Sequence, residues 1–95
     1  DFTAMGVIQQ LKTQNIHVPH EVGVIGFANE AFGSLVSPTL STIDQQTNRM
    51  GEEIASQFLK MLKDGDFYKS APLRIKLDPL LIIRESSHGP NWENI

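Results

Sequence analysis

Residues 22–30 are Val22-Gly23-Val24-Ile25-Gly26-Phe27-Ala28-Asn29-Glu30, and this stretch decides the predicted fold. Its first part, Val22–Phe27, is short and almost entirely apolar. Such a run is typical of a strand buried on both faces in a parallel sheet that helices cover. The glycines within it allow close approach of a neighbouring backbone or ligand. Residues 29–37 are expected to form a loop or short helical turn that ends at Pro38.

Two amphipathic helices are predicted on either side of this stretch. The first runs from Phe2 to about Gln14, with apolar residues at helical spacing, and Asn15 is expected to end it in a left-handed conformation. The second runs from Thr47 to about Lys63, and Gly65 is suited to cap its C-terminus. The second helix carries an apolar stripe at Met50, Ile54, Phe58, Met61 and Leu62.

Three further strands are predicted. Leu40–Asp44 is short, Leu73–Leu77 alternates apolar and basic residues as a half-exposed strand does, and Leu80–Ile83 is expected to be buried. Buried strands beside amphipathic helices indicate an α/β fold with a mostly parallel sheet flanked by helices. With 95 residues the chain is expected to form one domain at most, and residues 88–95 a flexible polar tail.

Composition excludes several classes of function. The formal net charge is -3, from 8 basic and 11 acidic residues, and nucleic-acid binding needs a basic face instead. The chain contains no cysteine, which fits a cytoplasmic protein and excludes disulfides and thiolate metal sites. No apolar run is long enough to span a membrane, and the start lacks the basic region of a signal peptide. The chain has no initiator methionine and is expected to be part of a longer protein.

No segment carries the spacing that catalysis or metal binding requires. His17 and His20 are three residues apart with Pro19 between them, whereas a helical metal site needs histidines four apart. Asp64-Gly65-Asp66 starts like a calcium loop but lacks the later ligands. Gly23 and Gly26 do not form a dinucleotide fingerprint, and Ser86-Ser87-His88 has no third group to orient the histidine. We therefore expect no enzyme, no cofactor and no metal.

Five segments, in order, resemble the lactose-repressor (LacI/GalR) family of transcriptional regulators. They are Asp1–Gly6, the run from Gly6 to Phe27, Pro38-x-Leu40-Ser41-Thr42-Ile43-x-Gln45, Met50-Gly51, and Leu81-Ile82-Ile83-Arg84-Glu85-Ser86-Ser87. The resemblance covers residues 1–87 and concerns the C-terminal part of the effector-binding domain.

The resemblance implies a partial sensor domain like a periplasmic binding protein. In the family a small effector, often a sugar or a purine, binds between two lobes and shifts the population of two conformations of a dimer. DNA is then bound only through an N-terminal helix-turn-helix, which this chain does not contain. The alternative is a fragment of a periplasmic sugar-binding protein, which has the same fold.

The resemblance also implies four candidate ligand-binding residues. Gln45 lies where the family often places a cleft residue, and an amide can both donate to and accept from a ligand. Ala28 stands where the family usually has a ligand-contacting aspartate, and its methyl group cannot accept a hydrogen bond. Asn29 or Glu30 could substitute for that aspartate without occupying its place. Asp1 belongs to the family motif and is expected to cap the first helix.

The family divides this chain between two lobes. Residues 1–44 and 80–87 are expected in the C-terminal lobe, and the helix and strand of residues 45–79 in the other lobe. The apolar stripe of the second helix would then lack its natural cover, so self-association with exchanged helices is expected. In the family, dimer contacts involve the first helix and the loop near Leu35 and Val36, which gives a second interface.

Overall fold

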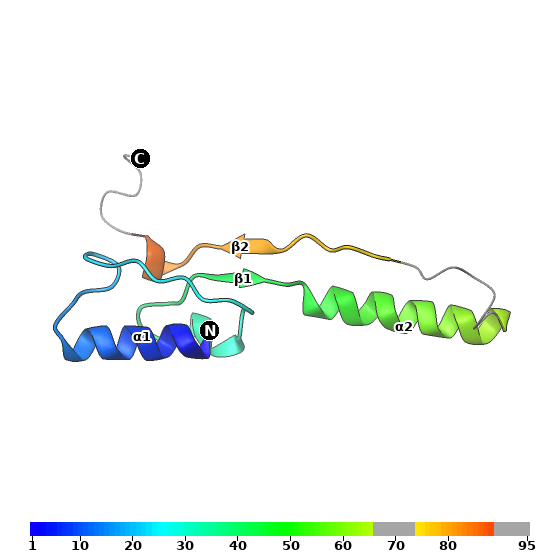
Figure 1. Cartoon of the computed structure of the whole chain (residues 1–95), viewed down its shortest axis with the longest axis horizontal. Helices are drawn as coiled ribbons and strands as arrows, with labels where there is room; N and C mark the ends of the chain where they lie inside the picture. Colours follow the sequence, from blue (N-terminus) through cyan, green and yellow to red (C-terminus); the bar gives the residue numbers. More distant parts are fainter. Residues whose placement is uncertain (66–73, 89–95) are drawn as a thin grey trace. The chain divides into compact units, whose positions relative to one another are not determined.

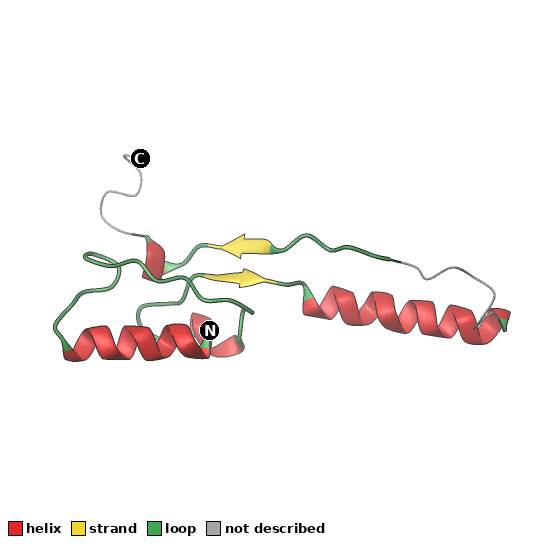
Figure 2. Cartoon of the chain, viewed as in Figure 1, coloured by secondary structure: helices red, strands yellow, loops and turns green. Residues whose placement is uncertain are grey.

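The computed structural model describes residues 1–65 and 74–88 (Figures 1 and 2). The chain forms two compact units, Asp1–Gln45 with Pro79–Ile95 (unit 1) and Gln46–Asp78 (unit 2). Unit 1 contains helix α1, two short 3-10 helices, η1 and η2, and strands β1 and β2. Unit 2 contains helix α2.

Helix α1 spans Phe2–Thr13, as predicted. Its buried residues, Ala4 and Ile8, are one helical turn apart and therefore lie on the same face. They pack with Val24 and Leu40 to form the core of unit 1. The helix ends before Asn15, whose positive φ of 58° confirms the predicted left-handed termination.

The segment predicted as a buried strand, Val22–Phe27, is extended but forms only an isolated parallel bridge between Ile25 and Ser41. The N–H of Gly26 in this segment donates to Ser41 O at 2.8 Å, and the N–H of Ala28, just after it, donates to Ile43 O at 2.9 Å. Val24 is buried on the α1 side, whereas Ile25 and Phe27 are each 53% exposed. The prediction of burial on both faces is therefore wrong, because α1 covers only one face of the segment within unit 1.

Strand β1 (Thr42–Asp44) pairs with β2 (Leu80–Ile82) in an antiparallel ladder, with Ile43 opposite Leu81. Figure 1 shows the two strands side by side. The predicted mostly parallel sheet is thus wrong for this ladder, and among residues 1–65 and 74–88 the parallel pairing is the isolated Ile25–Ser41 bridge. Leu80 and Leu81 are 52% and 59% exposed, so the predicted burial of this strand is also wrong.

A network of buried hydroxyl groups joins three separate segments of unit 1. Ser86, in η2 (Glu85–Ser87), donates from Oγ to Val24 O at 2.6 Å and accepts from Ser41 N at 2.8 Å. The Ser41 hydroxyl donates to Arg84 O and accepts from Arg84 N, at 3.0 and 2.7 Å. Its remaining lone pair faces the Ser87 hydroxyl at 2.6 Å. Ser41 and Ser86 are fully buried, and these bonds satisfy both hydroxyls.

Helix α2 spans Thr47–Asp64, as predicted to within one residue at its end. Gly65, with φ of 66°, donates its amide to Met61 O, which confirms the predicted cap. No residue of α2 is buried. Residues 74–77 form no strand, so this part of the Leu73–Leu77 prediction is wrong, and Leu73 lies outside the described residues. Of the predicted tail at 88–95, only His88 is described.

None of the helices among residues 1–65 and 74–88 combines the length and the apolar composition that crossing a bilayer requires.

Replacing Ser86 with alanine is expected to lower the free energy of unfolding of unit 1 by about 2–4 kcal/mol, because Ser41 N and Val24 O both lose a buried partner. Urea unfolding followed through the amide resonances of residues 4–44 measures this change. Ser56→Ala, at an exposed position of α2, is the matched control and should change stability very little. Equal free energies of unfolding for the two variants would show that the hydroxyl network does not stabilise unit 1.

Candidate functional site

The candidate site lies where two parallel extended segments end. Residues 24–28 run parallel to residues 41–43, and Asn29 and Asp44 follow at their carboxyl ends. In open α/β sheets, ligands bind outside the carboxyl ends of parallel strands, where side chains of neighbouring loops converge. Polar side chains from four separate parts of unit 1 meet at this edge.

Asn29 is the centre of this polar cluster. Its Nδ2 donates to Asp44 Oδ2 and its Oδ1 accepts from Arg84 Nη2, each at 3.3 Å. Its backbone N–H donates to the Thr42 hydroxyl at 3.1 Å. A φ of 55° puts Asn29 in the left-handed region, which asparagine adopts more readily than most residues. The loop conformation therefore holds the Asn29 amide between a carboxylate and a guanidinium.

Asp1 joins the cluster through its carboxylate. Oδ1 accepts from the Thr42 hydroxyl at 2.7 Å, and Oδ2 accepts from Glu30 N at 2.5 Å. Asp1 occupies the N-cap position of α1 but makes no side-chain cap hydrogen bond. The predicted capping role is therefore wrong, because both carboxylate oxygens are directed to other segments. The Glu30 backbone, rather than its side chain, contacts Asp1 here.

Arg84 ties the cluster to the buried hydroxyl network, although it was not among the predicted site residues. Nη1 donates to Leu40 O at 2.9 Å while Nη2 reaches Asn29. The flat guanidinium lies beside Gly33 in η1 (Ala31–Ser34), where an added Cβ would be only 3.1 Å from Nη1. The signal for Arg84 was present in the Arg-Glu-Ser-Ser segment, but its partner at residue 29 is far away in sequence.

Ala28 contributes backbone rather than side chain. Its N–H donates to Ile43 O at 2.9 Å, and its φ is 109°. This φ lies outside the regions that residues with a Cβ ordinarily occupy, so the conformation is strained. The structure thus places Ala28 beside Asn29 at the carboxyl end, with a methyl group that cannot form a hydrogen bond.

Gln45 follows β1 and is partly buried. Within the described part of the chain, its side chain makes no hydrogen bond. Asp1, Ala28 and Asn29 are therefore brought together by hydrogen bonds, while Gln45 is linked to them only through its position directly after Asp44. Its amide retains the capacity to donate to and accept from a ligand.

The cluster consists of polar and charged side chains that hydrogen bond to one another. Two carboxylates, Asp1 and Asp44, and one guanidinium, Arg84, are held together by Asn29 and Thr42. The cluster contains no histidine, and its Thr42 hydroxyl, which donates to the Asp1 carboxylate, also accepts from Asn29 N and so links two segments. In residues 1–65 and 74–88, no three His, Cys, Asp or Glu side chains gather as metal ligands.

Residues 1–87 match the periplasmic binding protein-like domain family. The match covers the whole of the polar cluster and both units up to Ser87. The predicted α/β fold of the periplasmic-binding-protein type is confirmed by this match and by solved structures.

Curated relatives are transcriptional regulators. The NTD biosynthesis operon regulator NtdR of Bacillus subtilis is 36% identical over 88 residues, which are 92% of this chain and 26% of that protein. The HTH-type transcriptional repressor PurR of Vibrio parahaemolyticus is 31% identical over 86 residues, 90% of this chain and 25% of that protein. The chain therefore spans about a quarter of the length of these relatives.

Solved structures agree with these relatives. A LacI family transcriptional regulator from Arthrobacter sp. FB24, in complex with lactose, has a TM-score of 0.82 and 30% identity over 93% of this chain and 32% of that chain. The Escherichia coli transcriptional repressor ascG has a TM-score of 0.75 and 31% identity over 87% of this chain and 29% of that chain. These relatives and structures confirm the resemblance to LacI-type regulators that the sequence indicated.

Replacing Ala28 with glycine is expected to raise the free energy of unfolding of unit 1 by about 1 kcal/mol, because glycine adopts a positive φ without a steric penalty. Ala31→Gly, in η1 where φ is not positive, should instead lower it by about 0.5–1 kcal/mol. Urea unfolding compares the two variants. If both substitutions destabilise unit 1 equally, residue 28 is not strained.

Proposed function

Because this chain belongs to the periplasmic binding protein-like domain family, we propose that it forms part of the effector-sensing domain of a bacterial transcriptional regulator. The observation that carries the proposal is the match to the operon regulator NtdR over 92% of this chain. The Arg84-Glu85-Ser86-Ser87 segment resembles the family's closing motif, which supports the proposal that this chain is the C-terminal part of that domain. A fragment of a periplasmic sugar-binding protein is the less favoured alternative, because the relatives named above are regulators.

The same proposal assigns residues 1–44 and 80–87 to one lobe of the sensor and residues 45–79 to the other. The compact units Asp1–Gln45 with Pro79–Ile95 and Gln46–Asp78 support this division, since their boundaries lie within one residue of the proposed ones. Regulation would follow if an effector favoured one arrangement of the lobes of the full sensor over another. No enzymatic step is needed for such a role, and DNA binding would belong to a helix-turn-helix elsewhere in a cytoplasmic regulator.

The effector is proposed to be a sugar or a purine that contacts Asp1, Ala28, Asn29 and Gln45. The convergence of the first three residues at the carboxyl ends of parallel segments supports this assignment. The lactose bound by the Arthrobacter regulator favours a sugar. Ala28 offers no side-chain hydrogen bond, so side-chain hydrogen bonds to the effector would come from Asp1, Asn29 and Gln45.

Dimerisation is proposed through α1 and the segment after η1. Phe2 and Leu35 are 75% and 83% exposed, and the Phe2 ring lies 4.9 Å from that of Phe32. These residues give unit 1 an apolar surface that a second copy of the regulator could cover.

The effector assignment is tested by Gln45→Ala in the full-length regulator, titrated with lactose and with guanine in a calorimeter. Loss of the amide is expected to weaken binding of the active probe about tenfold, the effect of one or two hydrogen bonds. Gln9→Ala, at an exposed position of α1, is the matched control. Unchanged affinity for Gln45→Ala would remove this residue from the site, and failure of both probes would exclude these two as effectors.

A further inference from the structure

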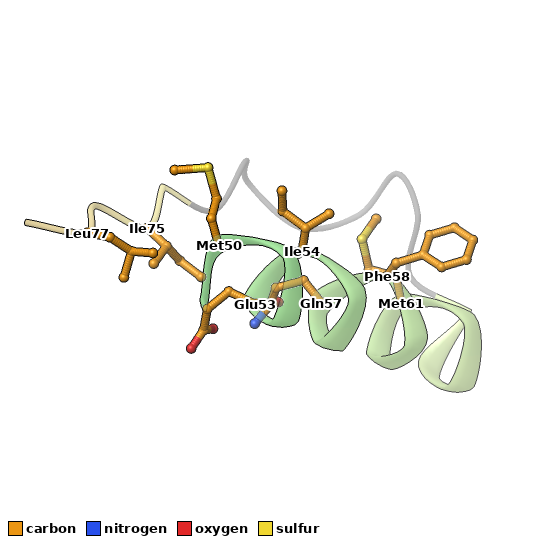
Figure 3. A pocket seen from close by; sticks show the side chains of 8 residues that line it. All are labelled: Met50, Glu53, Ile54, Gln57, Phe58, Met61, Ile75 and Leu77. Carbon is orange, nitrogen blue, oxygen red and sulfur yellow. The ribbon is translucent and has the colours of Figure 1, made fainter. Parts of the chain in front are cut away.

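Unit 2 has an apolar groove along α2, whose lining includes Met50, Ile54 and Phe58 (Figure 3). The chain spans about a quarter of the length of its relatives, so the exposure of this groove does not identify a partner. The guanidinium of Arg84 in unit 1, by contrast, has hydrogen-bond partners within the described residues. These contacts indicate a role for Arg84 in the candidate site.

The side chain of Arg84 is held at both ends. Ser41 Oγ binds the N–H and the carbonyl of Arg84, at 2.7 and 3.0 Å, and so fixes the backbone from which the side chain starts. At the far end, Nη1 donates to Leu40 O at 2.9 Å and Nη2 donates to Asn29 Oδ1 at 3.3 Å. A guanidinium is planar and its N–H groups diverge in a fixed pattern, so the bond to Leu40 O restricts where Nη2 points. Arg84 therefore presents a donor to Asn29 in a defined direction.

The two neighbours of the Asn29 amide select one of its two orientations. A guanidinium can only donate hydrogen bonds, and an ionised carboxylate can only accept them. The amide oxygen therefore faces Arg84 and the NH2 group faces Asp44, whose Oδ2 lies 3.3 Å from Asn29 Nδ2. Rotating the amide by half a turn would place its NH2 group against the guanidinium and its oxygen against the carboxylate. Both of these contacts would be repulsive, so the orientation is fixed from two sides.

We propose that Arg84 is a positioning residue of the effector site, because it fixes the direction in which Asn29 offers its NH2 group. This role rests on the proposed function, in which Asn29 contacts the effector. One N–H of the amide is directed at Asp44, and the other is the donor for the effector. The group that it meets on the effector is a hydrogen-bond acceptor, such as a hydroxyl or carbonyl oxygen. Arg84 acts through Asn29 and not by touching the effector.

Gly33 provides the space that the guanidinium needs. It is buried in η1, and a Cβ added to it would lie 3.1 Å from Arg84 Nη1 but 3.7 Å from its next neighbours, which belong to Leu40. The first distance requires the guanidinium to move, whereas the second is an ordinary van der Waals contact. Gly33 does not have a positive φ, so its backbone also suits alanine. Gly33→Ala therefore displaces the guanidinium without removing any hydrogen-bonding group.

A double-mutant cycle in the full-length regulator tests the positioning role, with affinities for lactose and for guanine measured by calorimetry. Arg84→Met removes the guanidinium and is expected to weaken binding of the active probe about tenfold. In an Asn29→Gly background, which suits the positive φ at residue 29, Arg84→Met should change the affinity very little. An equal loss of affinity in both backgrounds, as a general loss of fold stability predicts, overturns the proposal.

Two further variants separate the position of the guanidinium from its charge. Gly33→Ala is expected to weaken binding by a similar factor and to add nothing in the Arg84→Met background. Ser34→Ala, at an exposed position of the same 3-10 helix, is the matched control and should bind as the unaltered regulator does. Arg84→Lys keeps the positive charge but lacks the two diverging N–H groups, so it should bind as weakly as Arg84→Met. Full affinity of Arg84→Lys would overturn the role of the guanidinium.

The order of the Asn29 side chain can be measured without any effector. Relaxation of the 15N nucleus of its amide, in full-length regulator labelled at asparagine, gives the order parameter of this group. The order parameter is expected to fall below about 0.6, the range of flexible groups, in Arg84→Met and to stay unchanged in Ser34→Ala. Equal order parameters in Arg84→Met and in the unaltered regulator overturn the proposal. If the unaltered regulator binds neither probe, the proposed effector class fails, and this measurement decides the positioning role by itself.

Discussion

The buried Ser86 hydroxyl is the constraint on which unit 1 depends. With its backbone, Ser86 binds Val24, Thr39 and Ser41, so a residue near the end of the described chain holds two earlier segments in place. The apolar core of unit 1 is small, with four buried hydrophobic residues among those described. A core of this size does little to fix how the chain segments align, because apolar contacts have no preferred direction. Hydrogen bonds of the hydroxyl groups constrain both the distance and the orientation of the segments that they join. The serines therefore specify how the segments align, and the apolar residues supply the burial.

The same network positions the candidate site. Ser41 Oγ bonds both the N–H and the carbonyl of Arg84, which fixes the backbone from which the guanidinium reaches Leu40 O and Asn29. Asn29 then holds its left-handed conformation between Arg84 and Asp44. A change in the buried serines would therefore alter the polar cluster without removing any of its members. The stability of unit 1 and the geometry of the candidate site therefore depend on the same set of contacts.

The helices and their ends could be predicted from the sequence, because helical periodicity and caps are local. Asn15 and Gly65 both adopt the positive φ expected of them. Burial could not be predicted for Ile25, Leu80 and Leu81, because an apolar strand is buried only when another element covers it. The chain also forms an antiparallel ladder from segments expected in a mostly parallel sheet.

The candidate site was predictable only where a family motif pointed to it. Asp1, Ala28 and Asn29 do converge, but through Thr42 and Arg84, whose roles depend on contacts spanning 41 and 55 residues. Asp1 could not be distinguished from a helix cap by sequence, since an aspartate before a helix suits both roles. In the structure its carboxylate instead accepts hydrogen bonds from the Thr42 hydroxyl and from Glu30 N.

The two units differ in what completes their structure. Unit 1 encloses a small apolar core and satisfies the buried hydroxyl of Ser86 within itself. Unit 2 has an amphipathic helix, α2, with no buried residue. A helix gains most of its stability in a protein by packing an apolar face, so the contacts that stabilise α1 lie inside unit 1, whereas those described for α2 leave its apolar face uncovered. Helical periodicity therefore explains why both helices form, and only for α1 does the described part of the chain also explain what its apolar face packs against.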